Sequence, residues 1–366
     1  MIKVLVDTAV LRRPATGTAR WVRGLTNAVA GQPDVNVLTS LGPPRVEGFK
    51  AGSPQPTAGD WLTRAANLAR QRWWYEYGIH RLADRERADV LLMPANLSAR
   101  SSRLPQVVAV LDVNFLTQPG TYESVPARYL AWAFRRAVRD ADALITISEF
   151  SKSELSRHLG ADPRAVTVVY PGLGQPVSPA IASPPLDRPY ALWVGATEVS
   201  KNVSLLLDAW ERGSPCGLSL AIVGPPGRDH TNLSDRAAKL GQRVVMPGAV
   251  NESELERWYR NAAVFLFPSR TEGFGFPPLE AMLREVPVVA SNAGSLPEVL
   301  GDAALFHEPD DAEMVRGHIE SLMQDEALRQ EYVLRGRNRA ARFRWESAGA
   351  QTAALLRTAA SITRHR

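Results

Sequence analysis

The sequence has a single cysteine and no long uninterrupted hydrophobic run. Cys216 is the only cysteine among 366 residues, so no internal disulfide can form, and a reducing compartment is the simple inference. No window reaches about 18 consecutive apolar residues, which argues against a membrane-spanning helix. No signal-peptide core follows Met1, because the strand-like run Ile2–Asp7 leads at once into a loop rich in arginine and proline. These absences predict a cytoplasmic protein.

Basic charge is concentrated in the first half of the chain. Residues 1–178 hold 22 Lys and Arg against 15 Asp and Glu, a net charge of +7, whereas residues 179–366 hold 21 against 23, a net charge of −2. A basic half favours an anionic partner, such as a membrane surface, a lipid phosphate or a nucleic acid. Ordinary solvated surface charge is the alternative. A peripheral position on the inner face of the membrane therefore stays open beside a purely cytoplasmic one.

Apolar runs typical of buried strands alternate with helical stretches along the whole chain, which indicates α/β architecture with doubly wound parallel sheets. The expected strands are Ile2–Asp7, Val35–Thr39, Val90–Met93, Val107–Leu111, Ala143–Ile147, Val166–Val169, Tyr190–Val194, Leu218–Val223, Arg243–Met246, Val264–Phe267, Val286–Ala290 and Ala303–Phe306. The proline-dense stretch 171–189 separates two series of six, and the length exceeds one comfortable core. We predict one Rossmann-like domain over residues 1–172, a second over 173–345 and a last segment over 346–366.

The stretch Ala263–Glu280 (AVFLFPSRTEGFGFPPLE) has the features of an anion site. A buried strand runs into a loop that contains Gly273 and Gly275, whose backbone N–H groups can approach a ligand closely. Two prolines then suit the first turn of a helix, whose N-terminus attracts negative charge. Glu272 in the loop and Glu280, expected in the first helical turn, frame the site, and one could meet a sugar and the other a ribose. An ordinary surface loop is the alternative.

Aromatic and basic residues are mixed in two helical stretches of the first half. They suggest a surface at a membrane interface, whose members would be Arg70, Arg72, Trp73, Trp74, Arg135 and Arg136. The same residues could stack on the bases of a nucleic acid, or the aromatic rings could simply lie in the core. We rank nucleic acid last, because a lipid phosphate explains the same charges equally well.

Motifs in both halves resemble glycosyltransferase family 4, in the right order from Ile2 to about Trp345. In the second half they are Trp193-Val194-Gly195, Lys201-Asn202, Ile222-Val223-Gly224, Pro247-Gly248, Pro268-Ser269, Glu272-Gly273-Phe274-Gly275, Glu280-Ala281-Met282, Ser291-Asn292, Leu296-Pro297-Glu298 and Gly301-Asp302-Ala303-Ala304. In the first half they are Gly17–Trp21 and Ile147–Ser151. The resemblance implies the GT-B arrangement, in which two Rossmann-like domains face a central cleft, the first binds the acceptor and the second the nucleotide-sugar. It also implies a last helix that crosses back to the first domain.

The same resemblance assigns roles to individual residues. Lys201 would stabilise the diphosphate, Glu272 would hold the donor sugar and face its cationic transition state, and Glu280 would bind the ribose. The resemblance implies retention of anomeric configuration, with backbone N–H groups near Phe274–Phe276 in place of a metal, so that no metal or cofactor is needed and the nucleotide-sugar is a substrate. The full set of donor-binding residues implied is Gly17, Leu111, Gly195, Gly273, Phe274, Gly275, Phe276 and Glu280.

Three departures from the family pattern bear on function. An arginine usual beside Lys201 is replaced, since Ala196 and Ser200 occupy its two customary positions. Leu111 replaces a histidine that normally faces the donor sugar near its 6-position, which predicts a preference for a 6-deoxy donor unless Leu111 simply packs in the core. Glu285 replaces a glycine that ends the helix after Glu280.

The predicted function is therefore a retaining glycosyltransferase that moves a sugar from a nucleotide-sugar to a glycan or lipid-linked acceptor in cell-surface polysaccharide or glycoconjugate synthesis. Two alternatives keep the fold and change the chemistry. One is a catalytically weak nucleotide-sugar-binding subunit of a transferase complex, and the other is a nucleotide-sugar epimerase or hydrolase.

Overall fold

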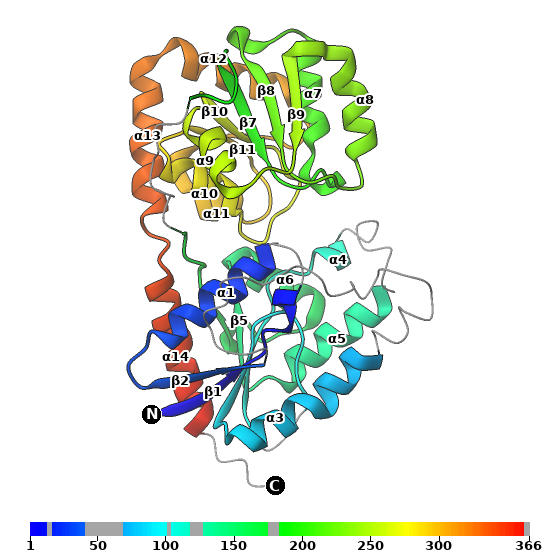
Figure 1. The fold of residues 1–366 in the computed structure, drawn as a ribbon, viewed down its shortest axis with the longest axis vertical. Coiled ribbons are helices and arrows are strands. Elements are labelled where there is room, and N and C mark those ends of the chain that lie inside the picture. The colour runs from blue at the N-terminus through cyan, green and yellow to red at the C-terminus, as the bar shows by residue number, and fades with distance from the viewer. Residues whose placement is uncertain (13–16, 41–68, 101–103, 118–126, 175–182, 362–366) are drawn as a thin grey trace. The chain divides into compact units, whose positions relative to one another are not determined.

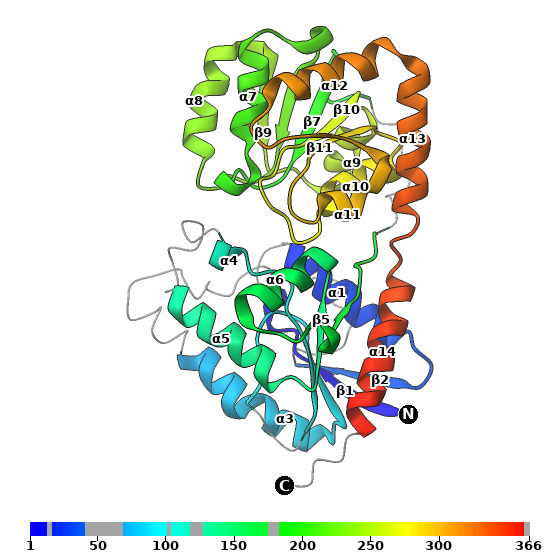
Figure 2. The ribbon, with the colours of Figure 1, turned by 180° about the vertical axis from the view of Figure 1, so that it is seen from behind.

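The computed structural model describes residues 1–12, 17–40, 69–100, 104–117, 127–174 and 183–361. The chain divides into two compact units, which are described separately (Figures 1 and 2). Unit 1 comprises Met1–Gly172 and Arg344–Arg366, and unit 2 comprises Leu173–Phe343. Residues 43–59, a segment rich in proline, glycine and serine that the sequence predicts to be an exposed loop, and residues 61–68 of the aromatic and basic stretch lie outside the described residues.

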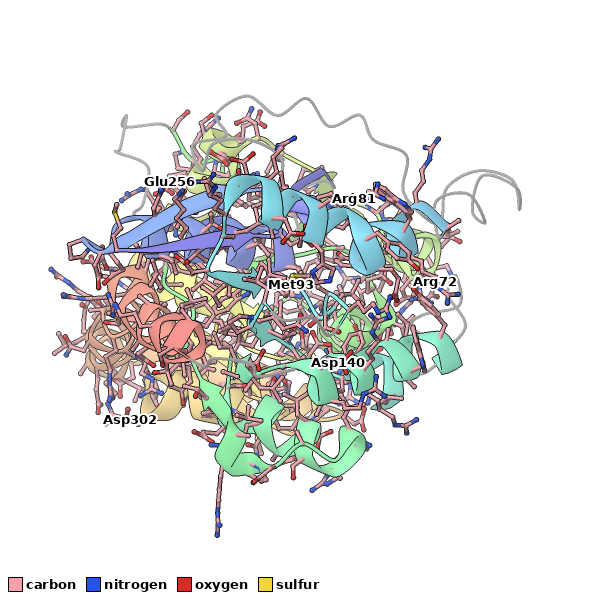
Figure 3. The ribbon with its side chains drawn as sticks, turned by 90° about the horizontal axis from the view of Figure 1, so that it is seen from below. Arg72, Arg81, Met93, Asp140, Glu256 and Asp302 are labelled. Carbon is pink, nitrogen blue, oxygen red and sulfur yellow. The ribbon has the colours of Figure 1, made fainter. Side chains whose placement is uncertain are left out.

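Unit 1 contains a six-stranded sheet in the order β2-β1-β3-β4-β5-β6, with every pairing parallel. Its strands are β1 (Ile2–Val6), β2 (Val35–Thr39), β3 (Val90–Met93), β4 (Gln106–Ala109), β5 (Ala143–Thr146) and β6 (Val166–Val168). All residues of β3 and β4 are buried, because helices cover both faces of a parallel sheet. Met93 at the end of β3 is 1% exposed and lies inside this core (Figure 3).

Helices flank the unit 1 sheet on both faces. They are α1 (Gly17–Ala30), α3 (Ile79–Glu86), α4 (Asn114–Thr117), α5 (Ala127–Asp140), α6 (Glu149–Leu159) and α14 (Trp345–Ser361), with a π-helical turn η2 (Trp74–Gly78) before α3. Helices α3, α5 and α6 pack on one face, in a cluster with side chains of β3 and β4. The last helix, α14, lies along α1 and contacts β3 and β4 (Figures 1 and 2).

A tryptophan at the start of α14 is fitted closely into unit 1. A Cβ atom added at Gly24 of α1 would lie 2.1 Å from the ring of Trp345, and one added at Gly172 would lie 2.2 Å from its backbone nitrogen. The Trp345 ring also lies 6.1 Å from the ring of Trp21. Glycine is required at position 24 because α1 and α14 approach so closely there.

Unit 2 repeats the architecture with a sheet in the order β12-β11-β10-β7-β8-β9, again parallel throughout. Its strands are β7 (Tyr190–Val194), β8 (Ser219–Val223), β9 (Val244–Gly248), β10 (Val264–Phe267), β11 (Val288–Ser291) and β12 (Ala304–His307). Its helices are α7 (Val203–Glu211), α8 (His230–Leu240), α9 (Glu252–Arg260), α10 (Phe276–Leu283), α11 (Leu296–Leu300), α12 (Ala312–Gln324) and α13 (Glu326–Ala340).

The helices of unit 2 also cover both faces of their sheet. Helices α7, α8 and α12 share one apolar cluster with alternate residues of the strands. Helix α10 packs against α9 and α13. All twelve strands expected from the sequence are present, with bounds that differ by at most two residues, so the prediction of two doubly wound parallel sheets is confirmed.

Candidate active site

The strand order of unit 2 reverses between β7 and β10. The chain runs outward from β7 to β8 and β9, then returns to place β10 on the other side of β7. The loops that follow β7 and β10 therefore leave the sheet in opposite directions, and ligands of doubly wound sheets bind in the crevice that such loops leave open. The loop after β7 contains Lys201 and the loop after β10 contains Glu272.

The structure brings these two predicted catalytic residues together. The Nζ atom of Lys201 lies 2.6 Å from Oε1 of Glu272, and their side chains are 28% and 13% exposed. The two loops are also joined through their backbones, since the Arg270 N–H donates to the Ser200 carbonyl at 2.9 Å. The switch point of unit 2 thus has a partly buried ammonium and a carboxylate in contact.

Asn202 fixes the position of Lys201. Its backbone has a left-handed φ of 53°, and its side chain is 3% exposed. The Asn202 amide donates to the carbonyl of Pro268 at 3.2 Å and to that of Pro309 at 2.7 Å, and so joins the loops after β7, β10 and β12. The sequence motif includes this asparagine, but its anchoring role follows only from the fold.

The loop after β11 supports Glu272 from the other side. The backbone N–H of Ser295 donates to the Glu272 carbonyl at 3.1 Å. A Cβ at Gly294, whose φ is +61°, would lie 2.7 Å from the Glu272 nitrogen, so only glycine allows this approach. The loop after β11 therefore holds the backbone of Glu272 by a hydrogen bond and by close packing. These contacts fix the point from which the Glu272 side chain extends.

The glycine-containing loop leads directly into α10, as the sequence predicts. Gly275 has a φ of +94° and caps the helix, which begins at Phe276 with prolines in its first positions. Phe274 is only 2% exposed, because its ring packs edge-on against Phe276 at 5.2 Å and against Phe343 at 5.4 Å. A ligand at this loop would therefore meet backbone N–H groups rather than the Phe274 ring. The remaining predicted residue of this stretch, Gly273, lies between Glu272 and Phe274.

Glu280 lies in the second turn of α10, not in the first. The prediction of a first-turn position was wrong because Gly275 caps the helix in a left-handed conformation and α10 already begins at Phe276, one residue before the two prolines, which makes Glu280 its fifth residue. The Oε2 atom of Glu280 accepts a hydrogen bond from the Tyr259 hydroxyl at 3.1 Å. Gly195, predicted for the donor site, follows β7, and its N–H donates to the Val223 carbonyl at 3.0 Å.

The two donor-site residues predicted in the first half belong to unit 1. Gly17 is the first residue of α1, and a Cβ added there would meet no atom within 4 Å. Leu111 follows β4 and is 3% exposed, and its N–H donates to Oδ1 of Asn96 at 2.7 Å. This burial favours the alternative in which Leu111 packs in the core, and the preference for a 6-deoxy donor stays a prediction.

A buried carboxylate lies at the switch point of unit 1, which the strand order places between β1 and β3. Asp7 is 5% exposed, and burial raises its pKa above the usual range. Four donors oppose that effect, namely the Tyr75 hydroxyl at 3.0 Å, the Ser40 hydroxyl at 3.1 Å, the Trp74 indole at 3.3 Å and the Ala9 N–H at 3.3 Å. Sequence reasoning missed Asp7, because its partners are up to 68 residues away.

The predicted aromatic and basic surface of unit 1 is only partly exposed. Trp73 and Tyr77 are 52% and 51% exposed, and Trp132 of α5 is 48% exposed. Trp74 instead donates to Asp7, and Arg136 pairs with Glu76 and Asp140. Two of the predicted members, Trp74 and Arg136, are thus engaged by internal carboxylates, and membrane binding by this surface stays a prediction. Figure 3 labels Arg72 on the helical residues before η2 and Asp140 at the end of α5.

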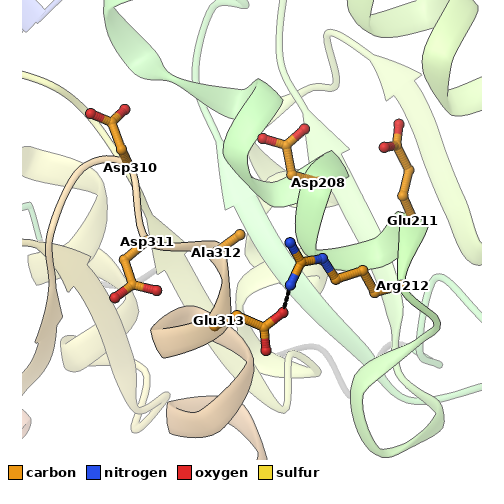
Figure 4. Close-up of a pocket in the computed structure, with 7 residues that line it drawn as sticks. All are labelled: Asp208, Glu211, Arg212, Asp310, Asp311, Ala312 and Glu313. Atoms are coloured by element: carbon orange, nitrogen blue, oxygen red, sulfur yellow. Dashed lines mark ion pairs between the residues drawn. The ribbon is translucent and has the colours of Figure 1, made fainter.

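A pocket on unit 2 does not match the chemistry of an anionic ligand. Seven residues line it, namely Asp208, Glu211, Arg212, Asp310, Asp311, Ala312 and Glu313 (Figure 4). Five of them are acidic, and Arg212 is paired with Glu313. This pocket would repel a diphosphate, and neither Lys201 nor Glu280 lines it. Among the described residues no cluster of three His, Cys, Asp or Glu has the arrangement of a metal site.

The chain matches two families of known proteins along most of its length. Residues 15–173 match the family described as Glycosyltransferase Family 4, and residues 176–339 match Glycosyl transferases group 1. The protein is therefore a glycosyltransferase. More particularly, it belongs to glycosyltransferase family 4, as the sequence motifs predict.

Curated relatives agree with this assignment. The chain is 34% identical over 267 residues to O-antigen chain mannosyltransferase B of Escherichia coli, a match that covers 68% of this chain and 70% of that protein. It is 30% identical over 242 residues to the D-inositol 3-phosphate glycosyltransferase of Streptomyces bingchenggensis, with 58% of this chain and 52% of that protein covered.

Solved structures show that the GT-B fold is shared. The sucrose-phosphate synthase of Thermosynechococcus elongatus aligns with a TM-score of 0.76 at 18% identity, over 98% of this chain and 99% of that one. Anabaena HepE in complex with UDP-glucose aligns with a TM-score of 0.73 at 17% identity, over 98% of this chain and 100% of that one. Among the described residues no helix is both long and apolar enough to cross a bilayer.

Proposed function

We propose that the protein transfers a hexose from a nucleotide-sugar to a glycan or lipid-linked acceptor of cell-surface polysaccharide, with retention of anomeric configuration. The observation that carries the donor site is the contact between Lys201 and Glu272 at the switch point of unit 2, beside the N-terminus of α10. The relatives named for mannosyl transfer and the neighbour bound to UDP-glucose support a hexosyl nucleotide as the donor.

The proposed reaction needs charge stabilisation at the leaving group. The bond between the anomeric carbon and the diphosphate oxygen breaks, and the acceptor hydroxyl forms a new bond to that carbon on the same face. The hydroxyl proton passes to the departing diphosphate. Lys201 and the backbone N–H groups at residues 274–276 stabilise the growing negative charge, so the reaction needs no metal. Glu272 holds the sugar hydroxyls and faces the sugar ring, which becomes positively charged in the transition state. Glu280 binds the ribose.

A panel of donors tests the proposal. GDP-mannose, UDP-glucose and a 6-deoxyhexosyl nucleotide are each incubated with the full chain, with and without EDTA, and the released or transferred sugar is followed by NMR. We expect one hexosyl donor to be consumed with retained configuration and no effect of EDTA. Inversion would overturn the retaining mechanism, and loss of turnover in EDTA would overturn metal independence. Tight binding without turnover would support the non-catalytic subunit instead.

We further propose that unit 1 binds an anionic membrane, which would bring the enzyme to a lipid-linked acceptor. The specific observation is that three rings, Trp73, Tyr77 and Trp132, are about half exposed, and that the guanidinium carbon of Arg136 lies 5.5 Å from the Trp132 ring centroid. Amphipathic rings suit the headgroup layer, and each exposed arginine beside it adds about 1 kcal/mol to binding an anionic surface. Arg70, Arg72 and Arg135 are exposed on the same elements.

Flotation with liposomes tests this surface. The full chain should float with phosphatidylglycerol vesicles at low salt and less so at high salt, because the charges are screened. Exchange of Trp73 and Trp132 for serine should abolish flotation. Leu334→Ser is the matched control, since Leu334 is a 60% exposed apolar residue of unit 2. Equal flotation of all variants, or none of the wild type, would rule the surface out.

A further inference from the structure

Tyr259 of α9 connects the interior of unit 2 to the predicted ribose ligand. The side chain is 1% exposed, and its ring stacks on Phe265 of β10 at a centroid distance of 5.6 Å. Its hydroxyl reaches Oε2 of Glu280 at 3.1 Å. A buried tyrosine hydroxyl requires a partner, and here that partner is a carboxylate of the candidate site.

A second set of contacts holds Tyr259 and Glu280 in register. The Arg284 guanidinium lies over the Tyr259 ring, 4.9 Å from its centroid, and donates to the Glu280 carbonyl at 2.8 Å. The same guanidinium donates twice to Oε2 of Glu256, at 2.9 and 2.6 Å. Glu256 is 7% exposed and also accepts from Arg260 at 2.6 Å. The network therefore fastens the end of α9 to the end of α10.

We infer that Tyr259 is a positioning residue that orients the Glu280 carboxylate for the two ribose hydroxyls of the donor. The inference rests on the proposed function, because it assumes that Glu280 meets a ribose. A glutamate side chain has three rotatable bonds, and a hydrogen bond to one carboxylate oxygen fixes the plane in which the group accepts. Orientation set before binding removes the cost of ordering the side chain when the ligand arrives.

The alternative is that the Tyr259 hydroxyl serves stability alone, and unit 2 offers a matched control. Tyr190 of β7 is also 1% exposed, and its hydroxyl donates to the Trp258 carbonyl at 2.8 Å. Both Tyr259→Phe and Tyr190→Phe remove one buried hydroxyl and keep the ring. Only Tyr259→Phe removes a contact with Glu280, so a difference between the two variants reports on the site.

Calorimetric titration of the full chain with UDP and GDP, and with their 2′,3′-dideoxy counterparts, tests the inference. We expect Tyr259→Phe to weaken binding of the better-binding diphosphate about five- to tenfold, within the range of one typical hydrogen bond, and Tyr190→Phe to change it less than twofold. Both variants should bind the dideoxy compound as the wild type does, because this compound has no ribose hydroxyls that could donate to Glu280.

Each remaining outcome decides a different point. The positioning role is overturned if Tyr259→Phe binds the ribose-containing diphosphate as tightly as the wild type does. It is also overturned if the variant loses the same factor in affinity for the dideoxy compound. In a background of Glu280→Ala, which removes the acceptor, the effect of Tyr259→Phe should disappear, and a persistent effect would also overturn the positioning role. If the wild type binds neither diphosphate, the proposed function fails instead. In turnover, Tyr259→Phe should raise the donor KM and leave kcat within about twofold.

Discussion

Lys201 and Glu272 are in contact at 2.6 Å, so the site balances one positive charge with one negative charge. Under the proposed function, the diphosphate of the donor would compete with the Glu272 carboxylate for the Lys201 ammonium. Donor binding would then release Glu272 toward the sugar. The contact also keeps the lysine ordered, which reduces the entropy lost on donor binding.

Replacement of Lys201 by alanine should lower kcat by about 100-fold or more, because it removes charge stabilisation that grows in the transition state. Glu280→Ala should instead act chiefly on the donor KM, since a ribose contact is equally strong before and during the reaction. Initial rates over a range of donor concentrations separate the two effects. Lys239→Ala, on the exposed face of α8, is the control. Wild-type turnover in the Lys201 variant would contradict the assignment.

The buried carboxylate of Asp7 should make stability depend on pH. Its folded pKa is raised by burial, so its contribution to stability is full below about pH 3.9, the unfolded value, and is lost as pH rises through the folded pKa. Asp7→Asn removes this titration. The free energy of unfolding of the wild type minus that of the variant should therefore fall as the pH rises above about 4 in urea titrations. A difference that grows with pH would mean that the four donors outweigh burial.

The chemistry-bearing residues of unit 2 were predictable from the sequence, but their contacts were not. Lys201, Glu272 and Glu280 stand in motifs that can be recognised without a structure, and their roles stay predictions. The contact between Lys201 and Glu272 depends on β7 and β10 being neighbours, which hydrophobic periodicity does not specify. Tyr259 was missed for the same reason, because its partner lies 21 residues away on another helix.

At the scale of elements, the turn that follows α10 contains a residue in an unfavourable conformation. Glu285 has a φ of +63°, where the family pattern has glycine, and its N–H donates to the Met282 carbonyl at 3.1 Å. A left-handed conformation costs a residue with a side chain about 1–2 kcal/mol. The Glu285 carboxylate pairs with Arg337 at 3.5 Å, but both side chains are well exposed and such a pair contributes little.

Glu285→Gly should therefore stabilise the protein by about 0.5–1 kcal/mol, after the greater freedom of glycine in the unfolded chain is subtracted. Urea or thermal unfolding measures the change. Glu285→Ala is the matched control, because alanine removes the charge and keeps the Cβ atom that causes the strain. Equal stabilisation by alanine would show that the charge, not the backbone, is responsible.

Strands were predicted within two residues because buried parallel strands are continuous apolar runs, a pattern visible without any partner. The start of α10 was predicted within one residue, but this small difference moves Glu280 from the first helical turn to the second. The π-helical turn at Trp74–Gly78 could not be predicted. Its first two residues donate to Asp7, which lies 67 residues or more earlier, so a distant contact accompanies the unusual local geometry.

At the scale of the molecule, unit 1 depends on the fit between α1 and α14. Alanine inside a helix is normally about 1 kcal/mol better than glycine, yet a Cβ at Gly24 would lie 2.1 Å from the Trp345 ring. Gly24→Ala should therefore destabilise the protein by about 1–3 kcal/mol, the usual cost of overpacking. Gly317→Ala in α12 is the control, since nothing lies within 4 Å of its added Cβ and it should stabilise. Parallel denaturant titrations of both variants decide the matter.

The assembly of unit 1 from both ends of the chain has a consequence for synthesis. Its sheet and α1 leave the ribosome early, but the helix that covers them, α14, is made of residues 345–361 and emerges after all of unit 2. Unit 2, which is continuous in sequence, can complete its fold while the apolar face awaiting α14 is still open to water. The nascent chain therefore leaves that face uncovered for as long as unit 2 is being made, and the half that is made first is the last to be finished.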